Sequence, residues 1–179
     1  MVRRVFIFIF ILLVSFSFAK TVFAQTDVSS FSAVKKQESV DYTLPYPGLL
    51  PDNPLYFLKS ARDKVIEFLI SSSQKKAEFF LLSSDKRLNT GYYLIQKNKD
   101  DMGVLYISKS NNYMHMAVSQ AKEAGQNGVD VLSKALISVQ KHEEIIKNVE
   151  SQVDKKNRSK LQDEFKRLEE IGSLIKPNK

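Results

Sequence analysis

The sequence predicts an all-α protein, an up-down antiparallel helical bundle of one short and four longer helices with a proline-rich N-terminal strap. Apolar side chains recur every three or four positions from Leu55 to Ile175, which is the period of an amphipathic helix. No segment alternates apolar and polar residues with a period of two, so we expect no strands. The breaks between the helical stretches are short, and short connections place successive helices antiparallel to each other.

The expected helices begin and end at residues that favour such boundaries. Asn53 can cap the first helix, and Pro54 suits the first helical position. Asp100 is expected to cap the third helix, which the segment Gly125 to Gly128 ends, because glycine and asparagine tolerate positive φ. The predicted helices span residues 55–70, 74–97, 101–124, 129–152 and 156–175.

The apolar lines along these helices predict how the bundle packs. The second helix alternates large and small residues along one seam, which predicts a close approach to another helix. That seam consists of Ala77, Leu81, Ser84, Leu88, Gly91 and Ile95. The first helix also carries an apolar face, which is expected to be buried. It consists of Leu55, Leu58, Ala61, Val65 and Leu69.

Residues 1–24 are predicted to be a secretory signal peptide. Two arginines precede an uncharged run from Val5 to Ala19, and a small residue, Ala24, ends the segment. Cleavage is expected after Ala24, with Ala19 as the competing site. The alternative is an uncleaved anchor, although the run is shorter than the roughly 20 residues that span a bilayer. In both cases the rest of the chain is expected to lie outside the cytoplasm, and membrane contact is expected only if the segment is retained.

The remaining chain is expected to form a flexible polar linker, residues 25–41, and one helical-bundle domain, residues 42–179. The domain opens with a strap over residues 42–54, where four prolines favour an extended backbone. Leucine and tyrosine dominate the positions between the prolines, so we expect the strap to lie across the helices of its own chain. The alternative is a ligand for an aromatic groove on a partner.

Composition excludes several classes of function. The chain of 179 residues has no cysteine, so disulfide scaffolds, thiolate metal sites and cysteine nucleophiles are excluded. Removal of residues 1–24 would leave 24 basic and 20 acidic residues, mixed along the helices. No basic stripe with stacking aromatic residues is visible, and we expect no nucleic-acid partner. Weak attraction to anionic lipid or to a wall polymer stays open.

The first candidate metal site is the run Met114, His115 and Met116. Methionine and histidine are suitable ligands for copper in an exported protein. Consecutive residues on a helix point about 100° apart, however, so these three side chains cannot converge on one ion without a break in the helix. We therefore expect His115 to lie on the solvated surface of the third helix.

His142 is the second candidate, because it falls on the apolar line of the fourth helix between Val139 and Ile146. A buried histidine needs a hydrogen-bond partner, and we expect a carboxylate or hydroxyl group on a facing helix. If that pairing were poor, replacement by leucine would be tolerated or mildly stabilising. The alternative is a ligand for a metal or haem between the helices. A single histidine does not make such a site, and no cofactor is expected.

We expect the protein not to be an enzyme. The sequence has no Gly-x-Ser-x-Gly elbow, no His-Glu-x-x-His motif and no phosphate-binding glycine loop. Its pairs of adjacent carboxylates lie among lysines, which is typical of a solvated helix face. No catalytic residues are assigned.

Residues 44–59, with the sequence Leu-Pro-Tyr-Pro-Gly-Leu-Leu-Pro-Asp-Asn-Pro-Leu-Tyr-Phe-Leu-Lys, carry a resemblance to a known family. Together with Ser84-Asp-Lys-Arg-Leu88 and Lys141-His-Glu143, this opening resembles an uncharacterised family of bacterial exported helical proteins, a domain of unknown function. The resemblance covers about residues 42–175. It implies a signal-bearing helical protein, often tethered to the envelope, and His142 with Glu144 matches a Lys-His-x-Glu-like position of the family.

These observations lead to the expected function. We expect an exported, non-catalytic helical bundle that binds or scaffolds in the cell envelope. Its partner is expected to be an unknown envelope protein or a wall polymer. The alternative is a metal or haem carrier that uses His142.

Overall fold

The structure, a computed structural model, describes residues 40–176. The predicted signal peptide and residues 25–39 of the predicted linker lie outside the described residues. Residues 40–176 contain helices and no strand, so the predicted all-α bundle is confirmed, and every predicted helix boundary lies within two residues of the observed one. The elements are α2 (Tyr56–Leu69), α3 (Ser73–Gln96), α4 (Asp100–Glu123), the short 3-10 helix η2 (Gly125–Gly128), α5 (Val129–Glu150) and α6 (Lys155–Ile175).

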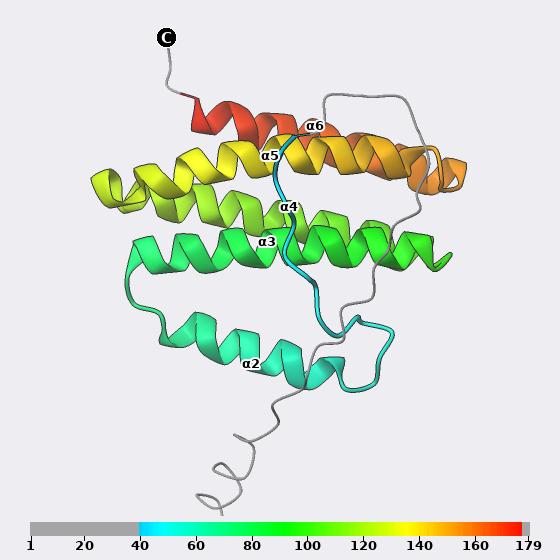
Figure 1. The fold of residues 1–179 in the computed structure, drawn as a ribbon, viewed down its shortest axis with the longest axis horizontal. Helices are drawn as coiled ribbons and strands as arrows, with labels where there is room; N and C mark the ends of the chain where they lie inside the picture. Colours follow the sequence, from blue (N-terminus) through cyan, green and yellow to red (C-terminus); the bar gives the residue numbers. More distant parts are fainter. Residues whose placement is uncertain (1–39, 177–179) are drawn as a thin grey trace, which may run out of the picture. The chain divides into compact units, whose positions relative to one another are not determined.

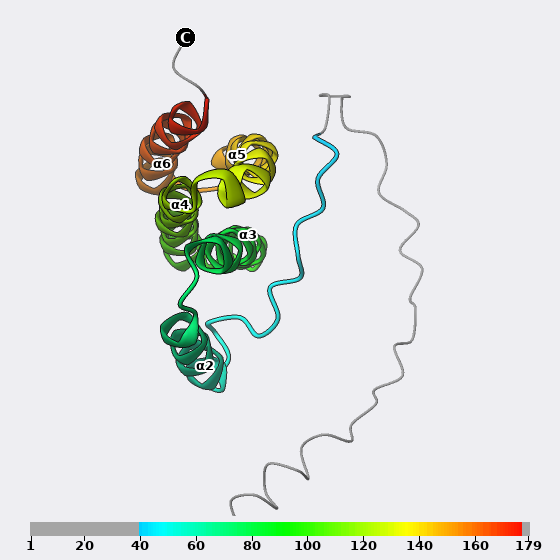
Figure 2. The ribbon, with the colours of Figure 1, turned by 90° about the vertical axis from the view of Figure 1, so that its left-hand side faces the viewer.

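Helices α3 to α6 pack against one another, and α2 lies beside α3 and α4 on the side away from α5 and α6 (Figures 1 and 2). The chain direction alternates from α3 to α6, as the colours in Figure 1 show. None of the helices in residues 40–176 has the length and apolar character needed to span a membrane.

The helix boundaries depend on backbone conformation more than on the expected caps. Asn98 has a positive φ of 56°, and the Lys99 amide behind it donates to the Leu94 carbonyl, which ends α3. The expected cap Asp100 is instead the first residue of α4. Asn53 also lies too early to cap α2. Its Oδ1 accepts a hydrogen bond from the Leu55 amide, and this turn lies before α2 begins at Tyr56.

The closest helix pair is α3 with α4, as the alternation of large and small residues predicted. A Cβ atom on Gly91 would lie 2.7 Å from the Gly103 carbonyl oxygen, and a Cβ on Gly103 would lie 2.9 Å from the Gly91 carbonyl oxygen. Only hydrogen side chains at both positions permit this backbone contact. The core on either side of it includes Ala77, Leu88, Ile107, Met114, Ala117, Val118, Val139 and Ile146.

The expected burial of the first helix's apolar face is wrong. No residue of α2 is buried, and the face that the sequence assigned to the core is exposed to solvent. The helical period reveals that an apolar stripe exists, but it does not determine which way the bundle turns that stripe. The exposed residues are Leu55, Leu58, Ala61, Val65 and Leu69.

Residues 40–54, here called the proline-rich segment, pass across α5 and α3 before they reach α2 (Figure 1). The Val40 amide donates to Glu144 of α5 at 3.1 Å, and Asn89 of α3 donates to the Pro45 carbonyl at 3.0 Å. Leu44 packs against the core, whereas Tyr46 is exposed. The segment is therefore attached by hydrogen bonds together with the packing of Leu44 and the burial of Pro47.

Candidate functional site

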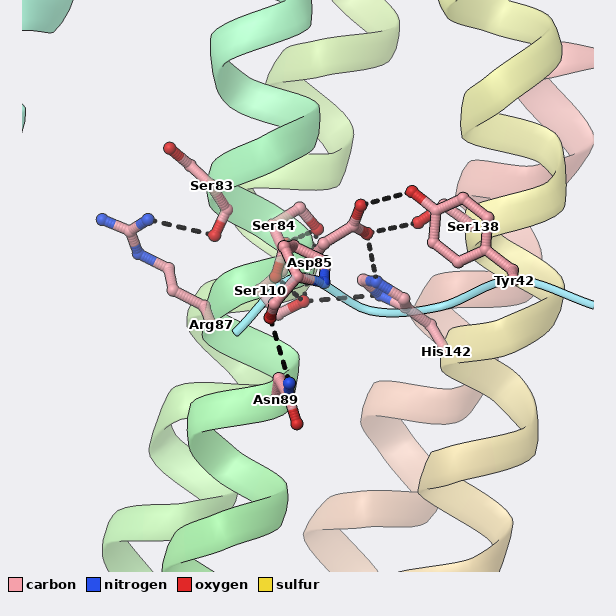
Figure 3. A network of polar contacts seen from close by, with 10 residues as sticks. Tyr42, Ser83, Ser84, Asp85, Arg87, Asn89, Ser110, Ser138 and His142 are labelled. Atoms are coloured by element: carbon pink, nitrogen blue, oxygen red, sulfur yellow. Dashed lines mark hydrogen bonds and ion pairs between the residues drawn. The ribbon is translucent and has the colours of Figure 1, made fainter. Parts of the chain in front are cut away.

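A buried cluster of polar side chains lies where the proline-rich segment crosses the bundle (Figure 3). At its centre is Asp85 of α3, whose carboxylate accepts three hydrogen bonds. The donors are the Tyr42 hydroxyl at 2.5 Å, the Ser138 hydroxyl at 2.5 Å and the His142 ring nitrogen Nε2 at 2.9 Å. The cluster thus joins α3, α5 and the proline-rich segment through one carboxylate.

The same cluster extends to α4 through Ser110. The Ser110 hydroxyl lies 3.4 Å from Nδ1 of His142 and donates to the Ser84 carbonyl at 3.0 Å. In return, the Ser84 hydroxyl donates to the Ser110 carbonyl at 2.9 Å. Small side chains at these two positions let α3 and α4 exchange hydrogen bonds inside the core, where unpaired polar groups would be costly.

The centre of the cluster is closed to solvent, and Tyr42 lies half-buried at its edge. The exposed fraction is 0% for the His142 side chain and 3% for the Asp85 side chain. The pKa of Tyr42 is raised above its ordinary value, first by burial and then by the hydrogen bond and negative charge of Asp85. Tyr42 therefore stays a neutral hydrogen-bond donor to the carboxylate at physiological pH.

The structure places His142 as a hydrogen-bonded core residue with the carboxylate and hydroxyl partners that the sequence predicted. Both ring nitrogens have a neighbour, so a metal or haem at this position would have to displace Asp85 or Ser110. Glu144, which the family resemblance associates with His142, lies outside the cluster. It instead accepts from the Val40 amide and pairs with Lys141 at 3.0 Å.

The candidate residues Met114, His115 and Met116 do not converge. Met114 is fully buried in the core, His115 is exposed, and Met116 is half-buried. His115 therefore lies on the solvated surface, as predicted. Within residues 40–176, no three histidine, aspartate or glutamate side chains are placed to hold a metal ion.

Sequence reasoning missed Asp85, Tyr42 and Ser138. Asp85 precedes a lysine and an arginine, which made it look like part of a solvated face, although it directly follows the seam residue Ser84. Ser138 lies four residues before His142 on α5, a spacing that places two side chains on one helix face. Tyr42 could not be found from a helical period, because it belongs to the extended proline-rich segment.

The second notable feature is the surface of α2 that faces away from the bundle, here called the outer face. It contains two phenylalanines, Phe57 and Phe68, whose exposed fractions are 64% and 88%. The remaining members are Leu58, Ala61, Val65 and Leu69. An amphipathic helix normally turns this side toward the core. In this bundle, α2 turns it toward solvent.

The inner side of α2 is polar and aromatic. Tyr56 packs edge-to-face on Tyr106 of α4, with ring centroids 6.0 Å apart. The Lys59 amine donates to the carbonyls of Pro47 and Leu49. These contacts fix which side of α2 faces the bundle, and they leave most of its apolar side chains exposed within residues 40–176.

A groove of about 200 Å³ lies between α2 and α3, and four of the residues that line it are basic. Lys59, Arg62, Lys86 and Arg87 line it with one acid, Asp63. Burial lowers the pKa of Lys59, and the positive charges of Arg87, Lys86 and Arg62 lower it further against the opposing effect of Asp63. The bundle side of α2 therefore carries a concentration of positive charge.

These features define a class of protein: an all-α bundle with a polar cluster whose centre is closed to solvent, and with one helix that presents its apolar side outward. The chain belongs to the family described as a domain of unknown function, DUF5667, which matches residues 48–178. The resemblance seen in the sequence is thus confirmed at the level of the family. No curated protein and no solved structure matches the chain.

Proposed function

We propose that this protein is an exported, non-catalytic helical bundle that binds or scaffolds in the bacterial cell envelope. The observation that carries the proposal is the outer face of α2. Large apolar side chains that gather on one exposed helix face can mark an interaction site. Here two phenylalanines and four aliphatic side chains lie together on one exposed helix.

A non-catalytic role is supported by the state of the polar cluster. Tyr42, Asp85 and His142 combine groups that enzymes use for proton transfer, but such groups must reach a substrate. Asp85 and His142 are closed to solvent, and the carboxylate is occupied by three donors from the protein itself. The cluster is better suited to holding four parts of the chain together.

A role as a metal or haem carrier has no comparable support. His142 would need one ring nitrogen free, and both nitrogens face a protein partner.

Export is supported by the sequence of residues 1–24, in which a basic start, an uncharged run and a small residue at the end follow the pattern of a secretory signal.

The proposal is tested by site-specific photocrosslinking of the full chain in the bacterium that produces it. The crosslinker replaces Phe68 on the outer face of α2, or Leu105 on α4 as a control on an exposed apolar residue elsewhere. We expect envelope components to be crosslinked from position 68 and not from position 105. Fractionation of the same cells should place the chain outside the cytoplasm. A chain confined to the cytoplasm, or equal crosslinking from both positions, would contradict the proposal.

A further inference from the structure

We infer that the outer face of α2 binds the surface of a lipid bilayer that carries anionic headgroups. This inference rests on the proposed envelope function and names the partner. The sequence led us to expect membrane contact through a retained signal segment and left weak attraction to anionic lipid open, and α2 offers a specific contact that is independent of the signal segment. In this arrangement α2 lies in the plane of the bilayer surface and does not cross it.

The geometry of α2 suits the surface of a bilayer. The 14 residues of α2 extend over about 21 Å at 1.5 Å per residue. Phe57, Phe68 and Leu58 lie within one continuous arc when successive residues are placed 100° apart. Tyr56, Lys59 and the other half-buried residues of α2 occupy the opposite arc, toward the bundle. A helix of this pattern can bury its apolar arc at the boundary between headgroups and acyl chains.

The exposed charges of α2 also suit an anionic surface. Arg62 and Lys64 are the exposed charged residues of α2, and both are basic, although the Arg62 guanidinium pairs with Asp63 at 2.7 Å. The acids of the same helix, Asp63 and Glu67, are half-buried on the side of the bundle. Basic residues beside an apolar arc complement anionic headgroups, since their long side chains can reach the phosphates while the arc is buried. The exposed side of α2 therefore matches an anionic surface in both charge and polarity.

The size of the outer face favours a bilayer over a second copy of the chain. A helix about 21 Å long and roughly 10 Å wide covers on the order of 200 Å², whereas a stable protein interface buries about 800 Å² on each partner. The outer face alone is therefore too small for a stable pair of copies. Such a pair would also bring Arg62 and Lys64 close to the same basic residues of the second copy. A bilayer surface has neither restriction.

The bundle also fixes the orientation of α2. The Tyr56–Tyr106 contact and the bonds from Lys59 to two carbonyls hold the polar arc inward. The apolar arc is therefore presented outward before any partner arrives, so binding need not begin with a change in the helix. Because the outer side chains make few contacts within the described chain, their replacement should leave folding intact.

The test uses tryptophan as a reporter, since the full chain contains none. Phe68→Trp places the reporter on the outer face, and Leu105→Trp places it at a residue of α4 that is 51% exposed and lies in a groove shared with α6. Each full-length variant is mixed with vesicles of phosphatidylglycerol and phosphatidylethanolamine whose acyl chains are brominated. We expect blue-shifted and quenched emission for Phe68→Trp and unchanged emission for Leu105→Trp.

Two further substitutions test the contributions of charge and apolar area in the Phe68→Trp background. Replacing Arg62 or Lys64 by glutamine should raise the vesicle concentration for half-maximal quenching about fivefold for each basic residue. Lys160→Gln on α6 is the matched control and should have no effect. Phe57→Ser should raise the same concentration roughly 10- to 100-fold. Circular dichroism should show equal helix content in all these variants.

Several results would overturn the inference. The inference fails if anionic vesicles neither shift nor quench the emission of Phe68→Trp. Emission that is already blue-shifted without vesicles would show that residues 1–39 or a second copy cover the outer face. If crosslinking from position 68 captured an envelope protein while lipid quenching was absent, the membrane inference would fail and the proposed function would stand. If vesicles quenched the emission of Phe68→Trp but the chain stayed in the cytoplasm, the proposed envelope function would fail and the membrane inference would stand.

Discussion

The ring nitrogen Nε2 of His142 lies 2.9 Å from Oδ1 of Asp85, and this contact joins α5 to α3 in the centre of the bundle. Because both side chains are closed to solvent, each depends on the other for its hydrogen bonding. The same carboxylate receives Tyr42 from the proline-rich segment. A change at this pair should therefore affect both helix packing and attachment of the segment.

We expect His142→Leu to destabilise the protein by about 2–4 kcal/mol, because it removes a donor from a buried carboxylate. A poorly paired histidine would have tolerated leucine, but the observed pairing reverses that expectation. The free energy of unfolding from urea titration provides the measurement. His115→Leu, at an exposed position on α4, is the control and should change stability by less than about 0.5 kcal/mol. If the two substitutions changed the free energy of unfolding by the same small amount, the His142–Asp85 pair would contribute nothing to stability.

We expect Tyr42→Phe to loosen the proline-rich segment by about 1–2 kcal/mol, because Asp85 loses one hydrogen-bond donor. Faster amide exchange at residues 42–50, with exchange in α3 to α6 less affected, would be the sign of this change. Tyr46→Phe, at an exposed tyrosine of the same segment, should leave exchange as it is.

The same contact should depend on pH in a defined direction. The folded-state pKa of Tyr42 is raised above 10.0, so the stabilisation is complete below about pH 10 and is lost as the pH rises through the folded value. Tyr42→Phe should lack this alkaline loss. If the segment opened at the same alkaline pH in both proteins, another group would be responsible.

We expect Gly103→Ala to destabilise the bundle by about 1–3 kcal/mol, although alanine is the better helix former. The added Cβ would lie 2.5 Å from Cγ1 of Ile95 and 2.9 Å from the Gly91 carbonyl oxygen, so the backbones of α3 and α4 would have to separate. Thermal unfolding would measure the change. Gly172→Ala is the matched control, since its Cβ would meet only Cγ1 of Val139, at 3.2 Å, and its effect should be smaller.

We expect Glu143→Gln to stabilise the protein at pH 7 by less than about 1 kcal/mol, a small value because partial exposure screens this group. Burial raises the pKa of Glu143 above 4.5, and the charge of Glu169 adds to this effect against Lys147 and Lys176. The ionised form is therefore the less favourable one in the folded protein, and its cost appears as the pH rises through this range.

Unfolding measured at two pH values tests this prediction. The advantage of Glu143→Gln should disappear below about pH 4, where both side chains are neutral. Glu144→Gln is the control on the neighbouring residue. It should be destabilising at pH 7, because Glu144 accepts from the Val40 amide and pairs with Lys141.

The sequence contained most of the fold because the helical period, the breaks and the small residues of α3 are all local properties. The close contact at Gly91 and the need of His142 for a polar partner followed from the apolar lines along the helices that carry these two residues. The orientation of α2 did not follow, since an apolar stripe looks the same in the sequence whether the folded chain turns it toward a core or toward solvent. Asp85 and Tyr42 could not be paired in advance, because their contact joins a helix to an extended segment 43 residues away.

The route of the proline-rich segment has a mechanical consequence. Its contacts follow one another along the chain, from Val40 with α5 to Tyr42 with Asp85, then Pro45 with α3 and Pro47 with α2. A force applied at Val40 would break these attachments one after another, as in peeling, instead of stretching them all at once. We therefore expect the bundle to yield a short length of chain at low force, and to keep α3 to α6 intact when whatever precedes Val40 is pulled.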